Sequence, residues 1–257
     1  MIMRNVSSVV ALALALAATP ALADDNQSFT ATTGIDFSSG SYGTDSKTDI
    51  LVVPVSLRYQ TGGLRLSATL PWLRIEGSSA VVGDGSGGVV IDPNAPRTTR
   101  SGLGDLSLGA SYMIPEETLG FGLDLSARVK LPTASESKNL GTGKTDFTVG
   151  AEVSKTFGTV TPFVSVGYRM PGDPAGFALN NAWNASAGAS FAMGKTIFIA
   201  SYDYRESTSP LSDDSHEVFG AVSLPLNDQL NFTLYGTGGL SDGAPDYGVG
   251  AMMTAKF

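Results

Sequence analysis

Apolar side chains recur at every second position from about residue 28 to residue 257, in runs separated by connections that alternate between short and long. Successive side chains of a β-strand point to opposite faces, so this period of two predicts strands with one apolar face. We expect about twelve strands, and ten or fourteen also fit, because boundaries read from sequence are uncertain by a few residues. The expected ranges are 28–38, 48–60, 64–76, 102–114, 121–132, 145–156, 160–170, 180–192, 196–206, 215–226, 229–239 and 246–257.

The connections sort into two classes by length. The short ones are residues 61–63, 115–120, 158–160, 193–195 and 227–228, whereas the others are longer and polar, and the longest covers about 77–101. Outer-membrane barrels have short turns at the periplasmic end and long loops outside. The pattern therefore predicts an all-β fold, a single membrane-spanning antiparallel up-and-down β-barrel over residues 24–257 with a long external loop at about 77–101.

The two faces of the expected strands differ in the way that such a barrel requires. In residues 121–131 one face carries Phe, Leu, Ala and Val, whereas the other carries Asp124, Arg128 and Lys130 together with Gly and Ser. Twelve strands enclose an interior wide enough for water, so the polar face is expected inside. The apolar face is then expected to contact outer-membrane lipid, with Trp and Tyr at the two interfaces.

Residues 1–23 have the features of a cleaved secretory signal peptide. Arg4 is followed by an apolar run at 9–18 and by Ala21-Leu22-Ala23 before the expected cleavage point. The run is too short for a membrane-spanning helix. We therefore expect export, and the strand pattern places the product in the outer membrane of a Gram-negative bacterium.

Composition excludes several classes of function. Without residues 1–23 the chain has 15 basic and 24 acidic side chains, a net charge of −9, which argues against nucleic acid as a partner. The sequence has no Cys, so disulfides and Cys-based metal sites are excluded. No cofactor and no metal site are predicted.

The last expected strand ends on an aromatic residue. Its alternation places Tyr247, Val249, Ala251, Met253, Ala255 and Phe257 on the lipid face. Pairing with the first strand would close the barrel and remove its edge. A terminal aromatic after alternating apolar residues resembles the signal read by the barrel-assembly machinery, which is the expected partner, although an ordinary edge strand would also give this pattern.

Charged residues recur on the face expected inside, and those expected in its outer half are Asp36, Asp105, Arg128, Lys130, Asp146, Arg169, Asp203 and Arg205. Five of them alternate in sign along consecutive strands: Asp105, Arg128, Lys130, Asp146 and Arg169. Neighbouring strands are about 4.8 Å apart, so these side chains are expected to touch. Facing acids and bases form a constriction that filters solutes by charge, or they pair to fill and stiffen the interior. Arg58 and Arg65 flank the 61–63 turn and either line the periplasmic mouth or are solvated beside it.

Short motifs in residues 100–170 resemble a known family. They are Gly102 to Leu106, Leu131-Pro132-Thr133, Leu140 to Gly143, and Asp146-Phe147. The sequence is similar to the outer-membrane family named after the meta-pathway of phenol degradation, whose members are often labelled transporters; Ala134 departs from the Gly expected after Thr133. The resemblance implies a channel for aromatic or other small hydrophobic compounds.

Three functions remain open from the sequence. A passive channel for small solutes is favoured by the polar interior positions. A closed structural barrel that acts through its external loops, residues 77–101 above all, is the alternative. An enzyme would have to use His216, the single His, but its neighbours Ser215 and Glu217 alternate faces with it and cannot form a triad. No catalytic residue is predicted.

Overall fold

The computed structural model describes residues 27–42, 46–78, 81–82, 89–90 and 96–257. The expected signal peptide and most of the expected 77–101 loop lie outside these residues. In the described part, none of the helices is long and apolar enough to cross a membrane.

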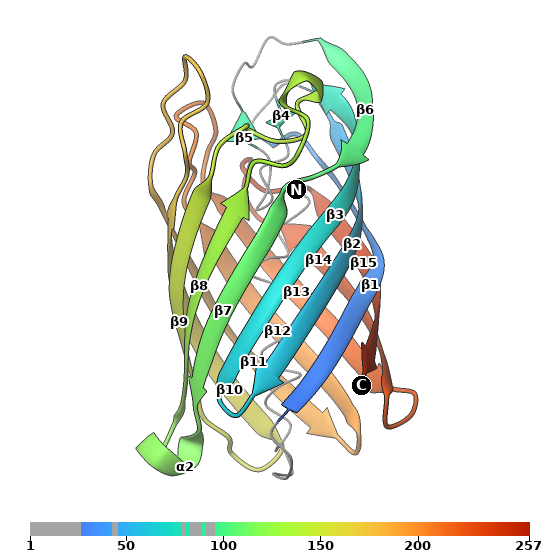
Figure 1. Ribbon diagram of the computed structural model, residues 1–257, viewed down its shortest axis with the longest axis vertical. Helices are drawn as coiled ribbons and strands as arrows, with labels where there is room; N and C mark the ends of the chain where they lie inside the picture. Colours follow the sequence, from blue (N-terminus) through green and yellow to red (C-terminus); the bar gives the residue numbers. More distant parts are fainter. Residues whose placement is uncertain (1–26, 43–45, 79–80, 83–88, 91–95) are drawn as a thin grey trace.

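Thirteen antiparallel strands form one closed sheet (Figure 1). β6 and β7 both pair with β3 and share one of twelve positions around the barrel, which confirms the expected twelve-strand barrel. The strands are β1 (Gln27–Gly40), β2 (Thr48–Thr61), β3 (Leu64–Ser78), β6 (Arg97–Leu103), β7 (Leu106–Ile114), β8 (Gly122–Leu131), β9 (Asp146–Ser154), β10 (Val160–Met170), β11 (Ala182–Met193), β12 (Thr196–Arg205), β13 (Ser215–Pro225), β14 (Leu230–Gly239) and β15 (Tyr247–Lys256).

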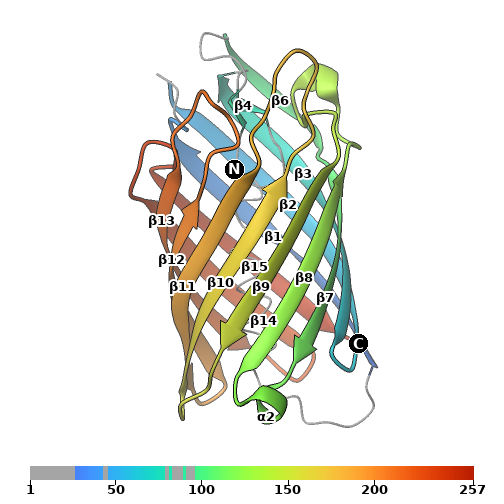
Figure 2. The ribbon, with the colours of Figure 1, turned by 90° about the vertical axis from the view of Figure 1, so that its left-hand side faces the viewer.

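The two ends of the barrel differ as expected (Figure 2). The short turns gather at one end with α2 (Glu116–Leu119), and we call this the short-turn end. The opposite, long-loop end carries the longer connections, including η1 (Glu136–Lys138) and the small hairpin of β4 (Val81–Val82) and β5 (Val89–Val90).

One expected boundary is wrong. Residues 97–101 were expected in the long loop, but β6 starts at Arg97 and pairs with the extended end of β3 as far as Ser78. The outward side chains Arg97 and Thr99 are polar and exposed, so this stretch lacks the apolar alternation that marks the other strands. The connection between β3 and β6 is therefore shorter than the sequence suggests.

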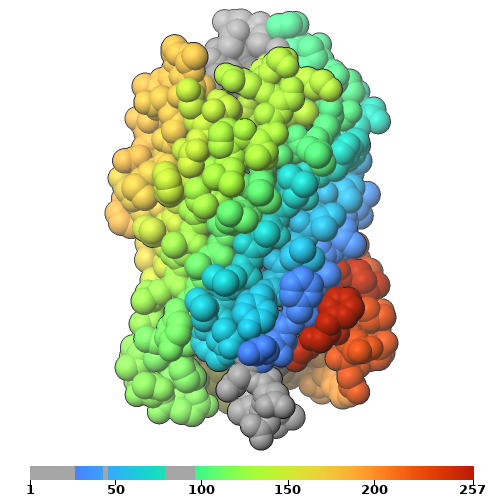
Figure 3. Space-filling view, viewed as in Figure 1, coloured from blue at the N-terminus to red at the C-terminus, as the bar shows by residue number. Residues whose placement is uncertain are grey.

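The first and last strands close the barrel. β15 pairs with β1 over Thr30 to Ser39, and Phe29 and Phe257 exchange backbone hydrogen bonds at 3.3 and 2.8 Å. Figure 3 shows the residues of these two strands side by side at the lower right, in blue and red. The expected pairing of the two terminal strands is confirmed, and the sheet has no open edge there.

The outward face is apolar and carries aromatic side chains at both ends. Exposed aromatics near the short-turn end are Phe29, Tyr112, Phe121, Phe157, Phe191, Phe198 and Phe257, and those near the long-loop end are Trp72, Phe147, Trp183, Tyr202 and Tyr247. Two such belts separated by Leu and Val are the pattern of a barrel that spans a bilayer.

An apolar cluster occupies part of the interior. Its members come from β10 and β12–β15 and are Phe163, Ile199, Phe219, Tyr235 and Met252. The phenol of Tyr235 lies over Gly250, where a Cβ would collide with the ring, and its hydroxyl donates to Asp36 Oδ2 at 2.6 Å. Bulky side chains thus project inward from one wall and narrow the interior.

Candidate functional site

Four of the predicted residues form one buried ion network near the long-loop end, which we call the outer network. Lys130 Nζ lies 3.2 Å from Asp105 Oδ2 and 3.3 Å from Asp146 Oδ2, and Arg169 Nη2 donates to Asp146 Oδ2 at 2.6 Å. β8, β9 and β10 place Lys130, Asp146 and Arg169 on the same inward face, and Asp105 directly precedes β7. The alternation of signs across neighbouring strands therefore produces direct contacts.

A second group of charges lies near the short-turn end, and we call it the inner network. Arg65 Nη2 donates to Asp124 Oδ2, and both side chains are buried. Glu152 is the register partner of Asp124; Arg65 is attracted by the charge of Glu152 and repelled by that of Arg58. The alternative in which the 61–63 turn leaves Arg65 solvated is wrong, because only 5% of this residue is exposed.

Two further predicted residues lie on β12. Asp203 accepts hydrogen bonds from Ser186 Oγ at 2.5 Å and from Ser201 Oγ at 3.1 Å. Arg205 pairs with Glu217 at 3.1 Å, and Glu217 also accepts from Ser215 Oγ at 2.6 Å. Asp203 therefore binds hydroxyls, whereas Arg205 belongs to an ion pair that the sequence reading did not include.

Arg128 does not join the outer network. It was expected in the alternating row, but it makes no hydrogen bond or ion pair with any described residue, and its Nη1 is buried without a partner. Arg58 likewise has neither. The two are the arginines that have no counterion among the described residues.

The family model described as "Putative MetA-pathway of phenol degradation" matches residues 23–257. The chain belongs to this family. The suspected resemblance is confirmed, and it extends beyond residues 100–170 to the whole barrel.

Several solved structures share the fold of this chain at low sequence identity. An outer membrane channel from Pseudomonas putida F1 is 16% identical with a TM-score of 0.67, covering 92% of this chain and 97% of that one. The translocator domain of the autotransporter NalP from Neisseria meningitidis is 11% identical at 0.56, covering 99% and 96%. The KdgM porin is 9% identical at 0.54, covering 90% and 99%. No curated protein matches the sequence. At these identities the likeness shows the fold, that of an outer-membrane barrel.

The family motifs converge on the outer network. Lys130 Nζ donates to Thr142 Oγ1 at 3.1 Å, and Asp105 Oδ1 accepts from the backbone N–H of Ala134 at 2.8 Å. Thr133 Oγ1 accepts a hydrogen bond from the Leu106 N–H at 2.8 Å and donates one to Gly104 O at 3.3 Å. Hydrogen bonds thus join the Gly-Leu-Gly-Asp-Leu segment to the Leu-Pro-Thr segment. Together they form a brace, which holds the β8–β9 connection against the start of β7.

Gly141 shows why this brace needs a glycine. A Cβ there would lie 2.7 Å from Asp105 Oδ2 and 2.9 Å from the Ala134 Cβ. Real Cβ atoms do not approach that closely, so any side chain would push the β8–β9 connection away from the ion network. The Leu-Gly-Thr-Gly motif is explained by this close approach together with the hydroxyl of Thr142.

His216 lies away from both networks. Its Nδ1 lies 2.5 Å from the hydroxyl of Tyr202, whose side chain is on the outward face. Ser215 and Glu217 point inward, so the three side chains do not meet. Within the described residues no group of three His, Asp or Glu side chains could hold a metal ion.

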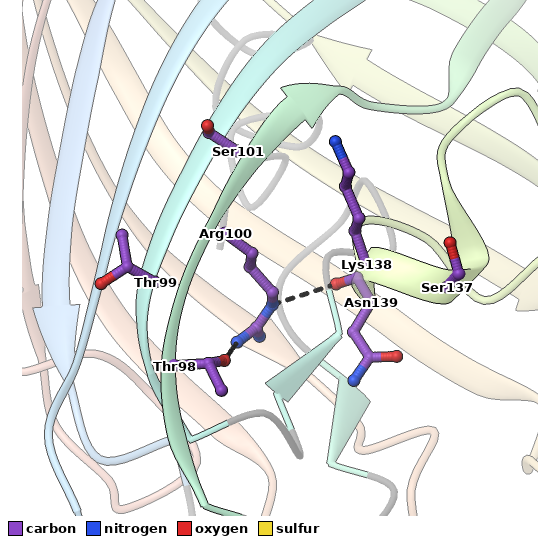
Figure 4. A pocket seen from close by; sticks show the side chains of 7 residues that line it. All are labelled: Thr98, Thr99, Arg100, Ser101, Ser137, Lys138 and Asn139. Atoms are coloured by element: carbon purple, nitrogen blue, oxygen red, sulfur yellow. Dashed lines mark hydrogen bonds between the residues drawn. The ribbon is translucent and has the colours of Figure 1, made fainter.

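A pocket of about 430 Å³ lies outside the predicted site, between β6 and η1 at the long-loop end (Figure 4). Its lining is polar: Thr98, Thr99, Arg100, Ser101, Ser137, Lys138 and Asn139. Arg100 spans it, donating to Asn139 O at 3.3 Å, Thr98 Oγ1 at 3.0 Å and Ser78 O at 3.2 Å. Its guanidinium therefore ties the β8–β9 connection to β6 and β3.

Proposed function

We propose that the protein is an outer-membrane channel for the passive uptake of small solutes. The observation that carries this is a closed barrel with an apolar outer face and an inner face of charged, Ser, Thr and Gly residues. A polar inner wall of this kind is what lines the water-filled path of a porin. Two of the similar structures are named as a channel and a porin, which supports the same function.

Small aromatic compounds are the proposed solutes. The description of the family names phenol degradation. The interior offers aromatic solutes the rings of Phe163, Phe219 and Tyr235 along one wall. The long-loop end is proposed to face the outside of the cell, and the short-turn end the periplasm, as in other outer-membrane barrels.

The inward charges are proposed to have two different roles. The outer network is deeply buried and braced by the β8–β9 connection, which favours stiffening of the wall over contact with solutes. Arg58, Arg128 and Glu152 are half-buried and make no ion pair with described residues, so they are the proposed filtering groups. Ion conductance of the purified, folded protein in planar bilayers tests the channel itself.

Export and assembly are proposed to depend on two segments of the chain. Residues 1–23 are proposed to direct export, and the outward residues of β15 together with Phe257 are proposed to be read by the barrel-assembly machinery. Phe257→Ser is expected to lower the amount of heat-modifiable, folded protein in the outer membrane, whereas Phe257→Tyr is expected to keep it. Equal amounts of the two variants would contradict the assembly role.

A further inference from the structure

Two arginines of the interior stand apart from all others. Every other described arginine has a carboxylate, hydroxyl or carbonyl partner: Arg65, Arg74, Arg97, Arg100, Arg169 and Arg205. Arg58 and Arg128 have none among the described residues, where Nη1 of Arg128 is a buried donor without an acceptor. A guanidinium withdrawn from water without a counterion is costly unless an anion reaches it.

The register places these two arginines on one row of the wall. Arg58 of β2 pairs with Ser67 of β3, Ser67 with Gly109 of β7, and Gly109 with Arg128 of β8. Three strand spacings separate the two Cα atoms by about 14 Å along the wall. Both arginines are on the inward face, and the two residues between them on the row, Ser67 and Gly109, are small. The row is therefore a stretch of inner wall with an arginine at each side.

Nearby acids do not neutralise this row. Asp124 is held by Arg65, and Lys130 above is held by Asp105 and Asp146. Glu152 lies four residues along β9 from Thr148, the register partner of Arg128, and interacts with Arg65 instead. Among the described residues, the row thus keeps its positive charge.

The wall opposite the row carries part of the apolar cluster. In the order of strands around the barrel, β12 and β13 lie across from the β2–β8 segment, and Ile199 and Phe219 of the apolar cluster are on them. Tyr235 and Met252 continue the cluster on the next two strands. Arg58 lies near the short-turn end of β2 and Arg128 nearer the long-loop end of β8, so the row crosses the wall obliquely, with the apolar cluster on the other side of the interior.

We propose that Arg58 and Arg128 form a binding site for the carboxylate of a small aromatic acid. Arginine offers a carboxylate two parallel N–H donors, and such charge-assisted pairs are strong where water is limited. The ring of the acid would lie towards the apolar wall. Passage of the acid rests on the proposed channel function, whereas its binding does not.

Calorimetric titration of benzoate into the purified, folded protein tests the site, with benzyl alcohol as the neutral probe of similar size. The wild type is expected to bind benzoate at least about tenfold more tightly than benzyl alcohol, the size of effect expected for hydrogen bonds to a charged group. Arg58→Gln/Arg128→Gln is expected to remove that preference, and Arg58→Lys/Arg128→Lys to keep part of it. Arg74→Gln/Arg97→Gln is the matched control, because it also removes two arginine charges, from exposed residues.

The outcomes are distinguishable. If the wild type binds benzoate no more tightly than benzyl alcohol, the proposed site is wrong, and no variant is needed for this result. The site is also wrong if the folded Arg58→Gln/Arg128→Gln variant keeps the preference for benzoate. Benzoate binding without ion conductance would keep the site and reject the channel. Conductance without a benzoate preference would keep the channel and reject the site.

Discussion

Replacing Lys130 with methionine is expected to lower the free energy of unfolding by about 3–5 kcal/mol, because removal of one partner leaves buried charge uncompensated. Lys130 is the cation that Asp105 and Asp146 share. Without it Asp146 keeps Arg169, but Asp105 keeps only the backbone N–H of Ala134. Urea titration of the folded barrel in detergent, followed by tryptophan fluorescence, measures the change.

Lys195→Met is the matched control for this substitution. Lys195 is exposed in the turn between β11 and β12, so the same change there is expected to stay within about 0.5 kcal/mol. Equal stability of the two variants would show that the outer network does not hold the wall.

Arg65→Met is expected to cost a similar amount, about 3–5 kcal/mol, because Asp124 would remain buried without its counterion. The double variant Arg65→Met/Asp124→Leu is expected to recover most of this loss. Buried ion pairs replaced by apolar residues of similar volume are often neutral or stabilising. Unfolding of the two single variants and the double variant gives the coupling energy directly.

The expected recovery separates two explanations of the pair. If Arg65 stabilises the barrel by cancelling the charge of Asp124, the double variant is more stable than Arg65→Met alone. A double variant no more stable than the single one would instead assign the loss to packing of the arginine side chain.

The barrel was predictable because lipid imposes one rule on every strand. Wherever a strand crosses the apolar layer its outward side chains are apolar, and the period of two marks it. β6 was missed at Arg97 to Ser101 for the same reason: its outward residues Arg97 and Thr99 are polar and exposed, so the alternation is absent. The error therefore concerns a stretch of strand whose outward side chains are polar, and the predicted number of strands was unaffected.

The outer network was predictable because its members lie on successive strands, where register brings inward charges together. The Arg65–Asp124 pair was not, since β3 and β8 are separated by β7, and Arg65 reaches Asp124 across this strand, where its own register partner is the small Ser111. Asp124 itself was on the predicted inward face. Its pairing needed the curvature and tilt of the barrel, which no local pattern records.

The apolar interior cluster was also missed, although each member lies in a predicted strand. Phe163 stands between Thr161 and Ser165 on the inward face of β10, as a single large residue among small polar ones. The cluster becomes visible only when β10 and β12–β15 are brought side by side. A large side chain on a face of Gly and Ser is the signal that could have found it.

Single-channel recording tests the central claim most directly. The purified, folded protein added to a planar bilayer in potassium chloride is expected to produce discrete, repeated current steps of uniform size, while the heat-unfolded protein produces none. Uniform steps would show that a continuous water path crosses the barrel between the apolar wall and the charged wall. Folded, inserted protein that never conducts would contradict the channel and leave a closed barrel acting through its loops.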